Sequence, residues 1–342
     1  MRRFAVDQVV MQVQVLFESV GVLTRDAADV AQMLVRTDCR GIKTHGLIRV
    51  ESYLALLRAG RVKAQPRVDE RSLVPTVSLV HGDNGLGQVV GTVAMKMAIK
   101  LAGQYGLGVC LIEQCGHMGA LGLYAERAAD VGMFGVVSQS TVPSMVVPGG
   151  GSPAIGNNPL AFAAPMPSGA PLVFDMSCSV AARGNVIVAE KFGRPIPEGW
   201  AVDKTGHSTT DPAVALQGGM LPVGAHKGLG LAMIVQSLAG VLSGTPMLPR
   251  ESSEGSLPHA GSFILVINGP KLVGGVEELA NRINQWTSTF RTLAGARARF
   301  PGQHARDKEQ EALRGGLPLE DLMVANLSRL CKEYGVEFFL RS

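Results

Sequence analysis

Residues 109–137, VCLIEQCGHMGALGLYAERAADVGMFGVV, decide the fold class. The stretch begins with an apolar run over Val109–Ile112 and ends with a second run over Phe134–Val137, and both runs are typical of buried strands. Between them, Leu121–Val131 has the length and composition of a helix. A strand, a helix and a strand in succession predict a layered α/β domain.

The same alternation continues on both sides of this stretch. We expect further strands and helices at Thr76–Val80, Val89–Ala102, Leu160–Ala163, Leu172–Phe174, Gly228–Leu242, Phe263–Ile267 and Val276–Phe290. Residues 245–261 are rich in proline, serine and glycine and predict a loop.

The two ends of the chain predict helices. Apolar residues recur at helical spacing from Val6 to Val20, and Thr24–Arg36 and Leu47–Leu57 predict two more helices. From Pro318 onward, leucines again share one face of a helix. We therefore expect the two termini to pack together as one helical layer.

Composition excludes several classes of protein. The 342 residues are 46% hydrophobic and 18% charged, which excludes intrinsic disorder. The net charge of +4 is not gathered into a basic run, so we expect no nucleic-acid or membrane partner. Five cysteines without a CxxC pair and no apolar run of about 20 residues predict a soluble cytoplasmic protein without a metal site.

Familiar catalytic and nucleotide-binding motifs are missing. The 42 glycines include no G-x-G-x-x-G, so the phosphate turn of the Rossmann fold is absent. The chain also has no P-loop, no HExxH and no GxSxG motif. The chemistry must therefore come from other polar clusters.

The first such cluster is DCRGIKTHGLIR, residues 38–49. On a helix, His45, Arg49 and Tyr53 would share one face, because they are spaced four residues apart. An arginine can bind a small carboxylate through two hydrogen bonds, and a histidine titrates near neutral pH. The alternative is a helix start that is capped by Thr44 and carries a surface arginine.

Further clusters follow strands or open helices. His117 lies between glycines after a strand, where α/β sites form, although a lone histidine can also be structural. The GGGSPAIGNNP segment (149–159) could present N–H groups to an anion or simply form turns. Lys227 near a helix start suits a phosphate, or merely begins the helix.

Together and in order, these segments resemble the malate/L-lactate dehydrogenase family of the L-sulfolactate dehydrogenase type. The similarity covers nearly the whole chain. It is carried by DxRGxx[ST]HGxxR from Asp38, GDNGLGQ (82–88), GHxG with Tyr124, IGNNPLAFA (155–163), FDMSCSxxARG (174–184), IPEGWAxD (196–203), HKGLGLA (226–232) and FPGQ (300–303).

The resemblance implies a three-layer α/β/α fold around a mixed sheet of about seven strands, with a helical layer formed by both termini. Residues 1–72 would carry part of the substrate site and pack with C-terminal helices over 275–342, and residues 73–274 would form the cofactor-binding domain. It also implies a homodimer with the active site near the subunit interface. The activity would be hydride transfer between a nicotinamide cofactor, NAD ahead of NADP, and C2 of a small anionic 2-hydroxy or 2-oxo acid.

Residue roles also follow from the resemblance. His117 matches the proton acceptor, although His45 remains an alternative base. Thr44, His45 and Arg49 match the substrate motif, and Tyr53 joins them as a substrate-binding residue. The positions that match cofactor contacts are Thr141, Asn157, Asn158, Pro159, Asp175, Met176, Ser177, Lys227, Pro301, Gly302 and Gln303.

Two departures from the family pattern leave the substrate open. Gln303 stands where an acidic residue is usual, and Asn185 stands where malate-type members carry lysine and imine reductases carry aspartate. Two alternatives follow. One is an NADPH-dependent reductase of cyclic imine carboxylates of the Δ1-piperideine-2-carboxylate type, and the other is a catalytically silent nucleotide-binding homologue.

Overall fold

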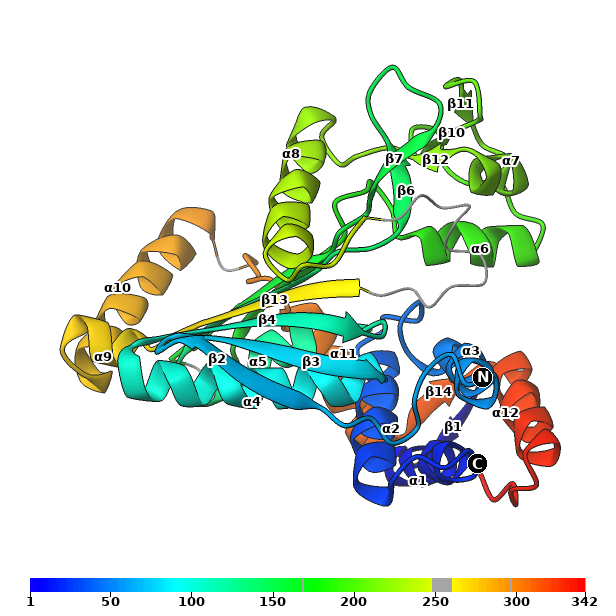
Figure 1. Cartoon of the computed structure of the whole chain (residues 1–342), viewed down its shortest axis with the longest axis horizontal. Helices are drawn as coiled ribbons and strands as arrows, with labels where there is room; N and C mark the ends of the chain where they lie inside the picture. The colour runs from blue at the N-terminus through cyan, green and yellow to red at the C-terminus, as the bar shows by residue number, and fades with distance from the viewer. Residues whose placement is uncertain (168, 248–259, 296, 342) are drawn as a thin grey trace.

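The computed structural model describes residues 1–167, 169–247, 260–295 and 297–341. Its centre is a mixed seven-stranded sheet in the order β2-β3-β4-β13-β5-β8-β9, in which β3 and β4 run parallel (Figure 1). The strands are β2 (Asp69–Val74), β3 (Val77–Gly85), β4 (Leu107–Cys115), β5 (Phe134–Gln139), β8 (Leu160–Ala164), β9 (Leu172–Met176) and β13 (Ala260–Ile267).

The predicted strands and the α/β class are confirmed. β2 was not predicted, because its six residues are all exposed and leave no buried pattern in the sequence. Of the loop predicted over 245–261, residues 248–259 lie outside the described residues, and residues 260 and 261 belong to β13.

Helices lie on both faces of this sheet, which gives the expected three layers (Figure 1). One face packs against α4 (Gly87–Tyr105) and α5 (Gly122–Asp130). The other face contacts the π-helical segment η2 (Gln236–Val241), which continues α8 (His226–Val235). Two more helices, α9 (Gly269–Val273) and α10 (Val276–Ala294), follow β13.

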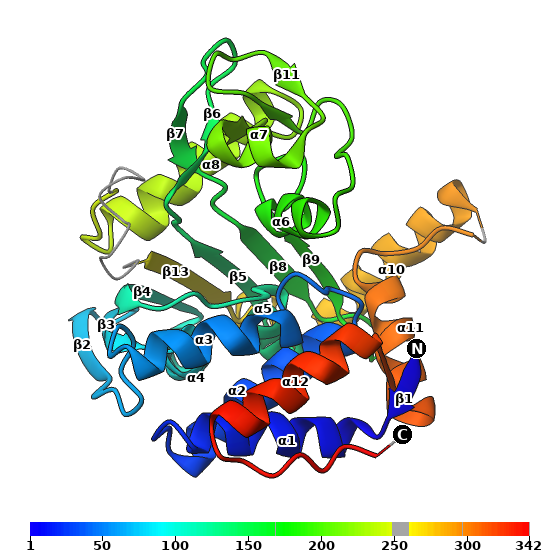
Figure 2. The same cartoon turned by 90° about the vertical axis from the view of Figure 1, so that its right-hand side faces the viewer.

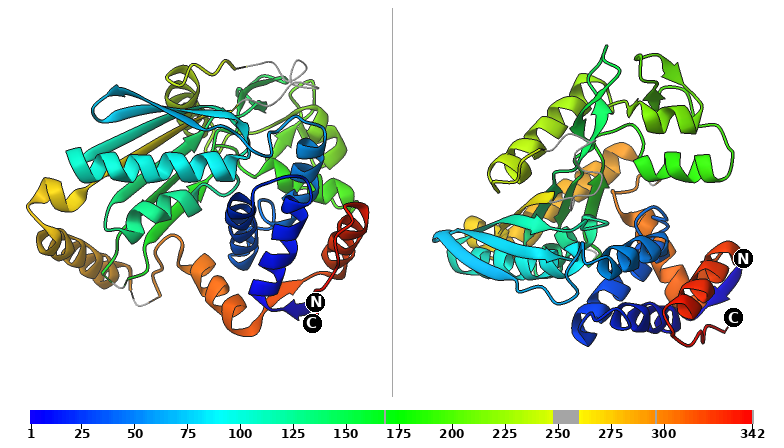
Figure 3. Two further views of the ribbon diagram at one scale, coloured as in Figure 1. Left: turned by 60° about the horizontal axis from the view of Figure 1, so that its bottom comes forward. Right: turned by 45° about the vertical axis from the view of Figure 1, so that its right-hand side comes forward.

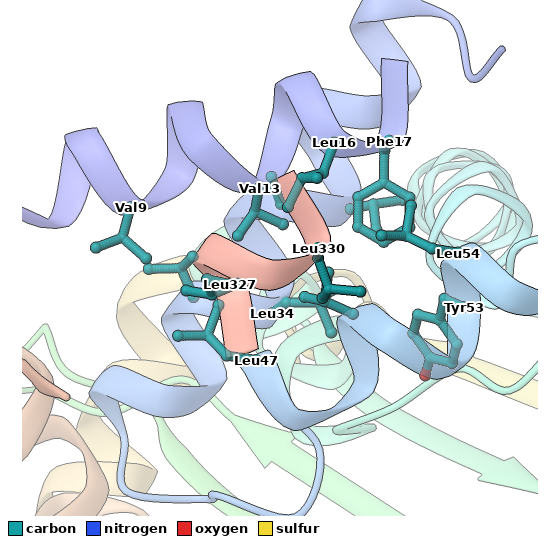
Figure 4. Packing of buried hydrophobic residues seen from close by; sticks show 14 of the residues in the cluster. Val9, Val13, Leu16, Phe17, Leu34, Leu47, Tyr53, Leu54, Leu327 and Leu330 are labelled. Atoms are coloured by element: carbon teal, nitrogen blue, oxygen red, sulfur yellow. The ribbon is translucent and has the colours of Figure 1, made fainter. Parts of the chain in front are cut away.

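The two chain termini form one layer, as expected. β1 (Arg2–Phe4) pairs with β14 (Leu317–Leu319), and the surrounding helices share one apolar core (Figure 2). Val13 and Phe17 meet Leu54 and Leu330 in this core (Figure 4). The helices of the layer are α1 (Val6–Glu18), α2 (Thr24–Cys39), the 3-10 turn η1 (Leu47–Arg49), α3 (Val50–Arg58), α11 (Gln303–Gly315) and α12 (Asp321–Glu333).

The segment boundaries differ from those expected. α10 does not join the terminal core, because only Leu279 and Thr287 of its 19 residues are buried. The C-terminal part of the layer therefore starts near residue 303 rather than at 275. At the other boundary, β2 already belongs to the central sheet from residue 69, ahead of the boundary expected at 72. Helix α11 was not predicted, because its sequence is mostly charged and polar.

A second, smaller sheet forms a lobe beside the seven-stranded one (Figure 3). Its strand order is β11-β10-β12-β6-β7, and Met145, Ala201 and Met220 help to fill its core. Several of its strands have only two residues, which is too short to leave a periodic pattern. The elements of the lobe are β6 (Pro143–Val146), β7 (Pro153–Gly156), α6 (Arg183–Lys191), β10 (Ala201–Val202), β11 (Ser208–Thr209), α7 (Pro212–Gln217) and β12 (Gly219–Met220).

Four charged side chains join the terminal layer to the α/β domain. Arg40, just after α2, contacts Glu126 of α5 and Glu309 of α11, each at 2.7 Å. Arg36 reaches the same two carboxylates at 2.9 and 2.5 Å. The side chains of Arg40, Glu126 and Glu309 are all less than 10% exposed, so each charge depends on its partners.

We expect Arg40→Met to destabilise the protein by roughly 3–5 kcal/mol, because it leaves two buried carboxylates with Arg36 alone. Urea unfolding measures the change. Arg282→Met is the matched control, because the Arg282–Glu278 pair on α10 is about half exposed and contributes roughly 0–1 kcal/mol. Equal losses in the two variants would contradict a special role for the buried cluster.

Candidate active site

A tight turn after α2 carries the first group of site residues. The Asp38 carboxylate accepts hydrogen bonds from the Leu47 N–H and, at 3.0 Å, from Lys43 Nζ. Glycine is required at position 46, because a Cβ there would lie 1.8 Å from Asp38 Oδ2. Asp38 therefore fixes both ends of the turn that presents Thr44 and His45.

This turn corrects one detail of the sequence prediction. His45 lies before the helix, because regular helix begins only with η1 at Leu47 and α3 at Val50. Thr44 does not cap the helix. Its hydroxyl instead lies 2.7 Å from Nδ1 of His45.

His117 is held in the loop between β4 and α5. The side-chain amide of Gln139 binds this loop twice, because its Oε1 accepts the Met118 N–H and its Nε2 donates to the Gly116 carbonyl, both at 3.1 Å. The Tyr124 hydroxyl donates to the Met118 carbonyl at 2.8 Å. These bonds come from β5 and α5, so the sheet and its covering helix position His117 together.

The two segments meet at the imidazole rings. The rings of His45 and His117 stack with their centroids 5.4 Å apart, and the Tyr53 hydroxyl lies 2.6 Å from Nδ1 of His117. Arg49 is fixed beside them, because its Nε donates to the Thr44 carbonyl at 2.7 Å. Sequence reasoning thus named residues that the fold brings together from α3, the Thr44 turn and the β4–α5 loop.

The surroundings keep both imidazoles neutral. Burial, assisted by the positive charge of Arg49, lowers the pKa of His45 to about 4. Burial also holds the pKa of His117 well below its usual range, and His45 and Arg49 add to the effect. Near pH 7 each ring therefore offers a lone pair, which is the form that accepts a proton.

Two of the residues expected on the cofactor side, Asp175 and Gly302, border a cavity of about 160 Å³. Asp175 of β9 and Gly302 line it together with Ile42, which lies two residues before Thr44. Gly302 has a φ of +88°, and a Cβ there would come 2.8 Å from the Val173 carbonyl oxygen. A glycine-lined wall with one carboxylate fits a hydroxylated ligand that approaches the backbone closely. Asp175 Oδ2 already accepts the Gly122 N–H at 2.7 Å.

The other expected cofactor residues divide into two kinds. Asn158 is fully buried, and its amide binds the Thr141 N–H and the Ala232 carbonyl, so its side chain holds the lobe to the sheet rather than a ligand. Asn157 accepts from the Thr141 hydroxyl. The remaining positions keep some exposed surface, and these are Pro159, Met176, Ser177, Lys227, Pro301 and Gln303.

Two neighbours of the site were not assigned a role from the sequence. Gly184 at the start of α6 touches it, because a Cβ there would lie 3.1 Å from the Thr44 side chain and 3.6 Å from an outer nitrogen of Arg49. Gln88 of α4 donates to the Tyr53 hydroxyl at 3.3 Å. Gln88 belongs to the GDNGLGQ segment, so a signal was present, but only the fold shows its partner.

Comparison with known proteins decides the family. The family model described as malate/L-lactate dehydrogenase matches residues 4–328. The chain belongs to the malate/L-lactate dehydrogenase family. It is therefore an oxidoreductase of small 2-hydroxy acids, and the predicted resemblance is confirmed.

The relatives of this malate/L-lactate dehydrogenase family member are named for different substrates and cofactors. The chain is 35% identical over 309 residues to a ureidoglycolate dehydrogenase (NAD(+)) of Escherichia coli O157:H7, with 88% of each chain covered. It is 39% identical over 258 residues to a (2R)-3-sulfolactate dehydrogenase (NADP(+)) of Chromohalobacter salexigens, with 73% of this chain and 76% of the other covered.

One solved structure illustrates the shared fold. The structure of a Δ1-piperideine-2-carboxylate reductase from Pseudomonas syringae pvar. tomato superposes with a TM-score of 0.88 at 26% identity, covering 96% of this chain and all of that one. The three-layer fold of this family member is thus confirmed.

Two further observations concern the described part of the chain. None of its helices has the length and apolar character needed to cross a membrane. Within the same residues, no three histidine, cysteine, aspartate or glutamate side chains gather closely enough to hold a metal ion.

The lowered pKa of His45 predicts how stability changes with pH. An unfolded histidine titrates near 6.5 and folded His45 at about 4, so the unfolded chain binds more protons between these values. The contribution of His45 to the free energy of unfolding is fully present above pH 6.5 and is lost as the pH falls toward 4. We expect wild type to lose about 1–2 kcal/mol more than His45→Gln between pH 7 and pH 5. Urea unfolding at both pH values tests this, and parallel losses would contradict it.

Proposed function

We propose that this family member transfers a hydride reversibly between C2 of a small 2-hydroxy acid, of the malate or L-lactate type, and a nicotinamide dinucleotide. The proposal is carried by the convergence of Arg49, His45 and His117 beside the cavity of Asp175 and Gly302. An anion anchor, a neutral base and a backbone-lined cavity are the three components that this reaction requires of a protein.

Arg49 is the anchor for the substrate carboxylate. Its Nε donates to the Thr44 carbonyl, which fixes the orientation of the guanidinium. Its two outer nitrogens can then form bidentate hydrogen bonds with a carboxylate. This bond directs C2 of the substrate toward the histidines. Thr44 and His45 then contact the oxygen on C2.

His117 takes the hydroxyl proton at Nε2, because Nδ1 is engaged by Tyr53. Bound nicotinamide supplies or accepts the hydride. Asp175 and the backbone at Gly302 would hold hydroxyl groups of the cofactor, and Lys227, which is exposed at the start of α8, would hold a phosphate. His45 remains the alternative base.

NAD is the cofactor we expect first, and NADP is the alternative. Gln303 bears on this choice, because its Oε1 accepts the Phe300 N–H at 2.8 Å and closes the turn before α11. The turn therefore presents no carboxylate at residue 303 that would repel the 2′-phosphate of NADP, so this position is compatible with NADP as well as with NAD. The two relatives named above likewise carry different cofactors in their names.

The second candidate is reduction of a cyclic imine carboxylate. The same anchor and proton donor would serve it, with nitrogen in place of oxygen as the protonated atom. The structural likeness to a Δ1-piperideine-2-carboxylate reductase favours keeping this candidate. Asn185 is exposed at the start of α6, next to the Gly184 contact with Thr44, so this position borders the substrate in either reaction.

We further propose a cytoplasmic homodimer. Helix α10 extends from the body of the molecule and leaves Val276, Trp286 and Leu293 at least half exposed (Figure 2). An amphipathic helix with so much uncovered apolar surface is typical of an interface. The five cysteines are buried and unpaired, which suits a reducing compartment. Light scattering that reports a monomer would contradict the dimer.

Parallel assays test the substrate class. The purified protein is given NAD+ or NADP+ with malate, L-lactate, 3-sulfolactate and ureidoglycolate, and NADH or NADPH with Δ1-piperideine-2-carboxylate. Turnover of a hydroxy acid supports the proposal, and turnover of the imine alone supports the second candidate. Cofactor binding without any turnover would favour a silent homologue.

His117→Ala should lower kcat by roughly 10²–10⁴-fold, because the reaction loses its proton acceptor. Cofactor binding, followed by nicotinamide fluorescence, should persist. His207→Ala is the control, because His207 is exposed in the lobe. Near-normal turnover by His117→Ala would transfer the role of base to His45.

A further inference from the structure

A chain of hydrogen-bonded polar groups leads from Nδ1 of His117 into the protein through Tyr53 and Gln88. Gln88 Nε2 donates to the Tyr53 oxygen at 3.3 Å, and that hydroxyl lies 2.6 Å from His117 Nδ1. Tyr53 and Gln88 are 4% and 1% exposed, so both lie inside the protein. Tyr53 sits at the edge of the terminal core with its hydroxyl directed out of it (Figure 4).

This arrangement changes the role expected for Tyr53. A substrate-binding phenol would present its hydroxyl to the ligand, whereas this hydroxyl contacts the far nitrogen of the base. The phenolic oxygen accepts from Gln88, and its own hydrogen points to Nδ1 in the form that serves reduction. The neutral ring then carries its own hydrogen on Nε2, on the side left for the substrate.

A neutral ring in this setting cannot complete the proton transfer alone. If it gave up its only hydrogen to a carbonyl oxygen, it would become an imidazolate, which is highly unfavourable. In oxidation the ring starts with its hydrogen on Nδ1, and taking the hydroxyl proton at Nε2 would make it an imidazolium, which burial beside His45 and Arg49 disfavours. A partner at Nδ1 that exchanges a proton in concert removes both difficulties.

A cavity lies next to this partner. It has a volume of about 40 Å³, is bordered by Tyr53 and His117, and reaches Arg61 and Asn84. A single water needs a cavity of roughly 10–15 Å³, so this cavity can hold a few waters. Asn84 Oδ1, on a residue that lines the cavity, and Gln88 Oε1, on the residue after Gly87 of its wall, are buried and have no hydrogen-bond partner among the described residues. Such acceptors are the groups that buried water satisfies.

We propose that Tyr53 is a proton relay that connects His117 to water in this cavity, with Gln88 as the residue that orients it. The proposal rests on the proposed function. In reduction, the carbonyl oxygen takes the Nε2 hydrogen as the hydride reaches C2. Nδ1 takes the phenolic proton, and the phenolic oxygen takes a proton from cavity water, which solvent replaces. The hydroxy acid gains one hydride and one solvent proton, and oxidation is the reverse.

The charged and titratable groups that face His117 and Tyr53 are a histidine, an arginine and a thiol of neighbouring segments. His117 faces His45 and Arg49 from the Thr44 turn and η1, and Tyr53 faces Arg49 and Cys115 of β4. Burial raises the pKa of Tyr53, and burial likewise raises the pKa of the Cys115 thiol to about 12. Tyr53 and Cys115 therefore stay protonated at rest in the neutral pH range.

Tyr53→Phe tests the relay, using a substrate that the wild type turns over in the assays above. We expect kcat to fall roughly 10- to 100-fold, part of the full contribution of a general acid or base, with KM little changed. The solvent deuterium isotope effect on kcat should rise, because proton transfer becomes slower than the other steps. A merely structural tyrosine would not change that isotope effect.

Tyr105→Phe is the control, because Tyr105 is a 44% exposed phenol at the opposite end of α4 from Gln88. It should keep the wild-type kcat and isotope effect. Gln88→Met is the second variant and should shift kcat and the isotope effect in the same direction as Tyr53→Phe, by less.

The outcomes separate the relay from the proposed function. A Tyr53→Phe enzyme with wild-type kcat and isotope effect would overturn the relay and leave hydride transfer by His117 intact. An isotope effect in Tyr105→Phe that rises as much as in Tyr53→Phe would also overturn it. Failure of the wild type to turn over any substrate would instead contradict the proposed function.

Discussion

The ion-pair cluster of half-buried Arg36 with buried Arg40, Glu126 and Glu309 is the constraint on which the rest of this structure depends. It joins α2 and α11 of the terminal layer to α5 of the α/β domain. A shift of one layer against the other would separate Arg36 and Arg40 from Glu126 or Glu309. Buried charges would then lack partners, which is strongly unfavourable. The relative position of the two layers is therefore fixed.

The candidate active site depends on that fixed position, because its residues belong to different layers. The Thr44 turn and Tyr53 come from the terminal layer, whereas His117 comes from the loop after β4 in the α/β domain. A hydrogen bond of 2.6 Å between Tyr53 and His117 tolerates little movement. The network of Arg40, two residues after Asp38 along the chain, thus holds the layers in the register that the proposed chemistry requires.

Within the site, burial and charge act in the same direction. Arg49 supplies the positive charge that a carboxylate needs, and the same charge keeps His45 and His117 unprotonated. A base whose pKa is lowered in this way must pass on any proton that it accepts. In the proposed relay the hydroxyl of Tyr53 and the adjoining cavity provide that route, so the anchoring of the substrate and the delivery of the proton would both depend on Arg49.

Much of the fold could be read from the sequence, because apolar periodicity is a local property. The strand at Val109–Ile112 and the helix at Leu121–Val131 were predicted within a few residues, and ordered motifs led to Arg49 and His117. The two-residue strands of the lobe left no such pattern, and the charged helix α11 is stabilised by ion pairs with Arg36 and Arg40 across 269–273 residues.

By itself, then, the sequence determined the longer apolar helices and strands, the family and the residue types of the site, since these depend on composition and spacing along the chain. Only the tertiary structure decided what those residues touch. It placed His45 on a turn instead of a helix, buried Asn158 against the Ala232 carbonyl, and brought the Tyr53 hydroxyl to Nδ1 of His117. Hydrogen bonds between segments far apart in the chain set these roles, and no local pattern encodes such distances.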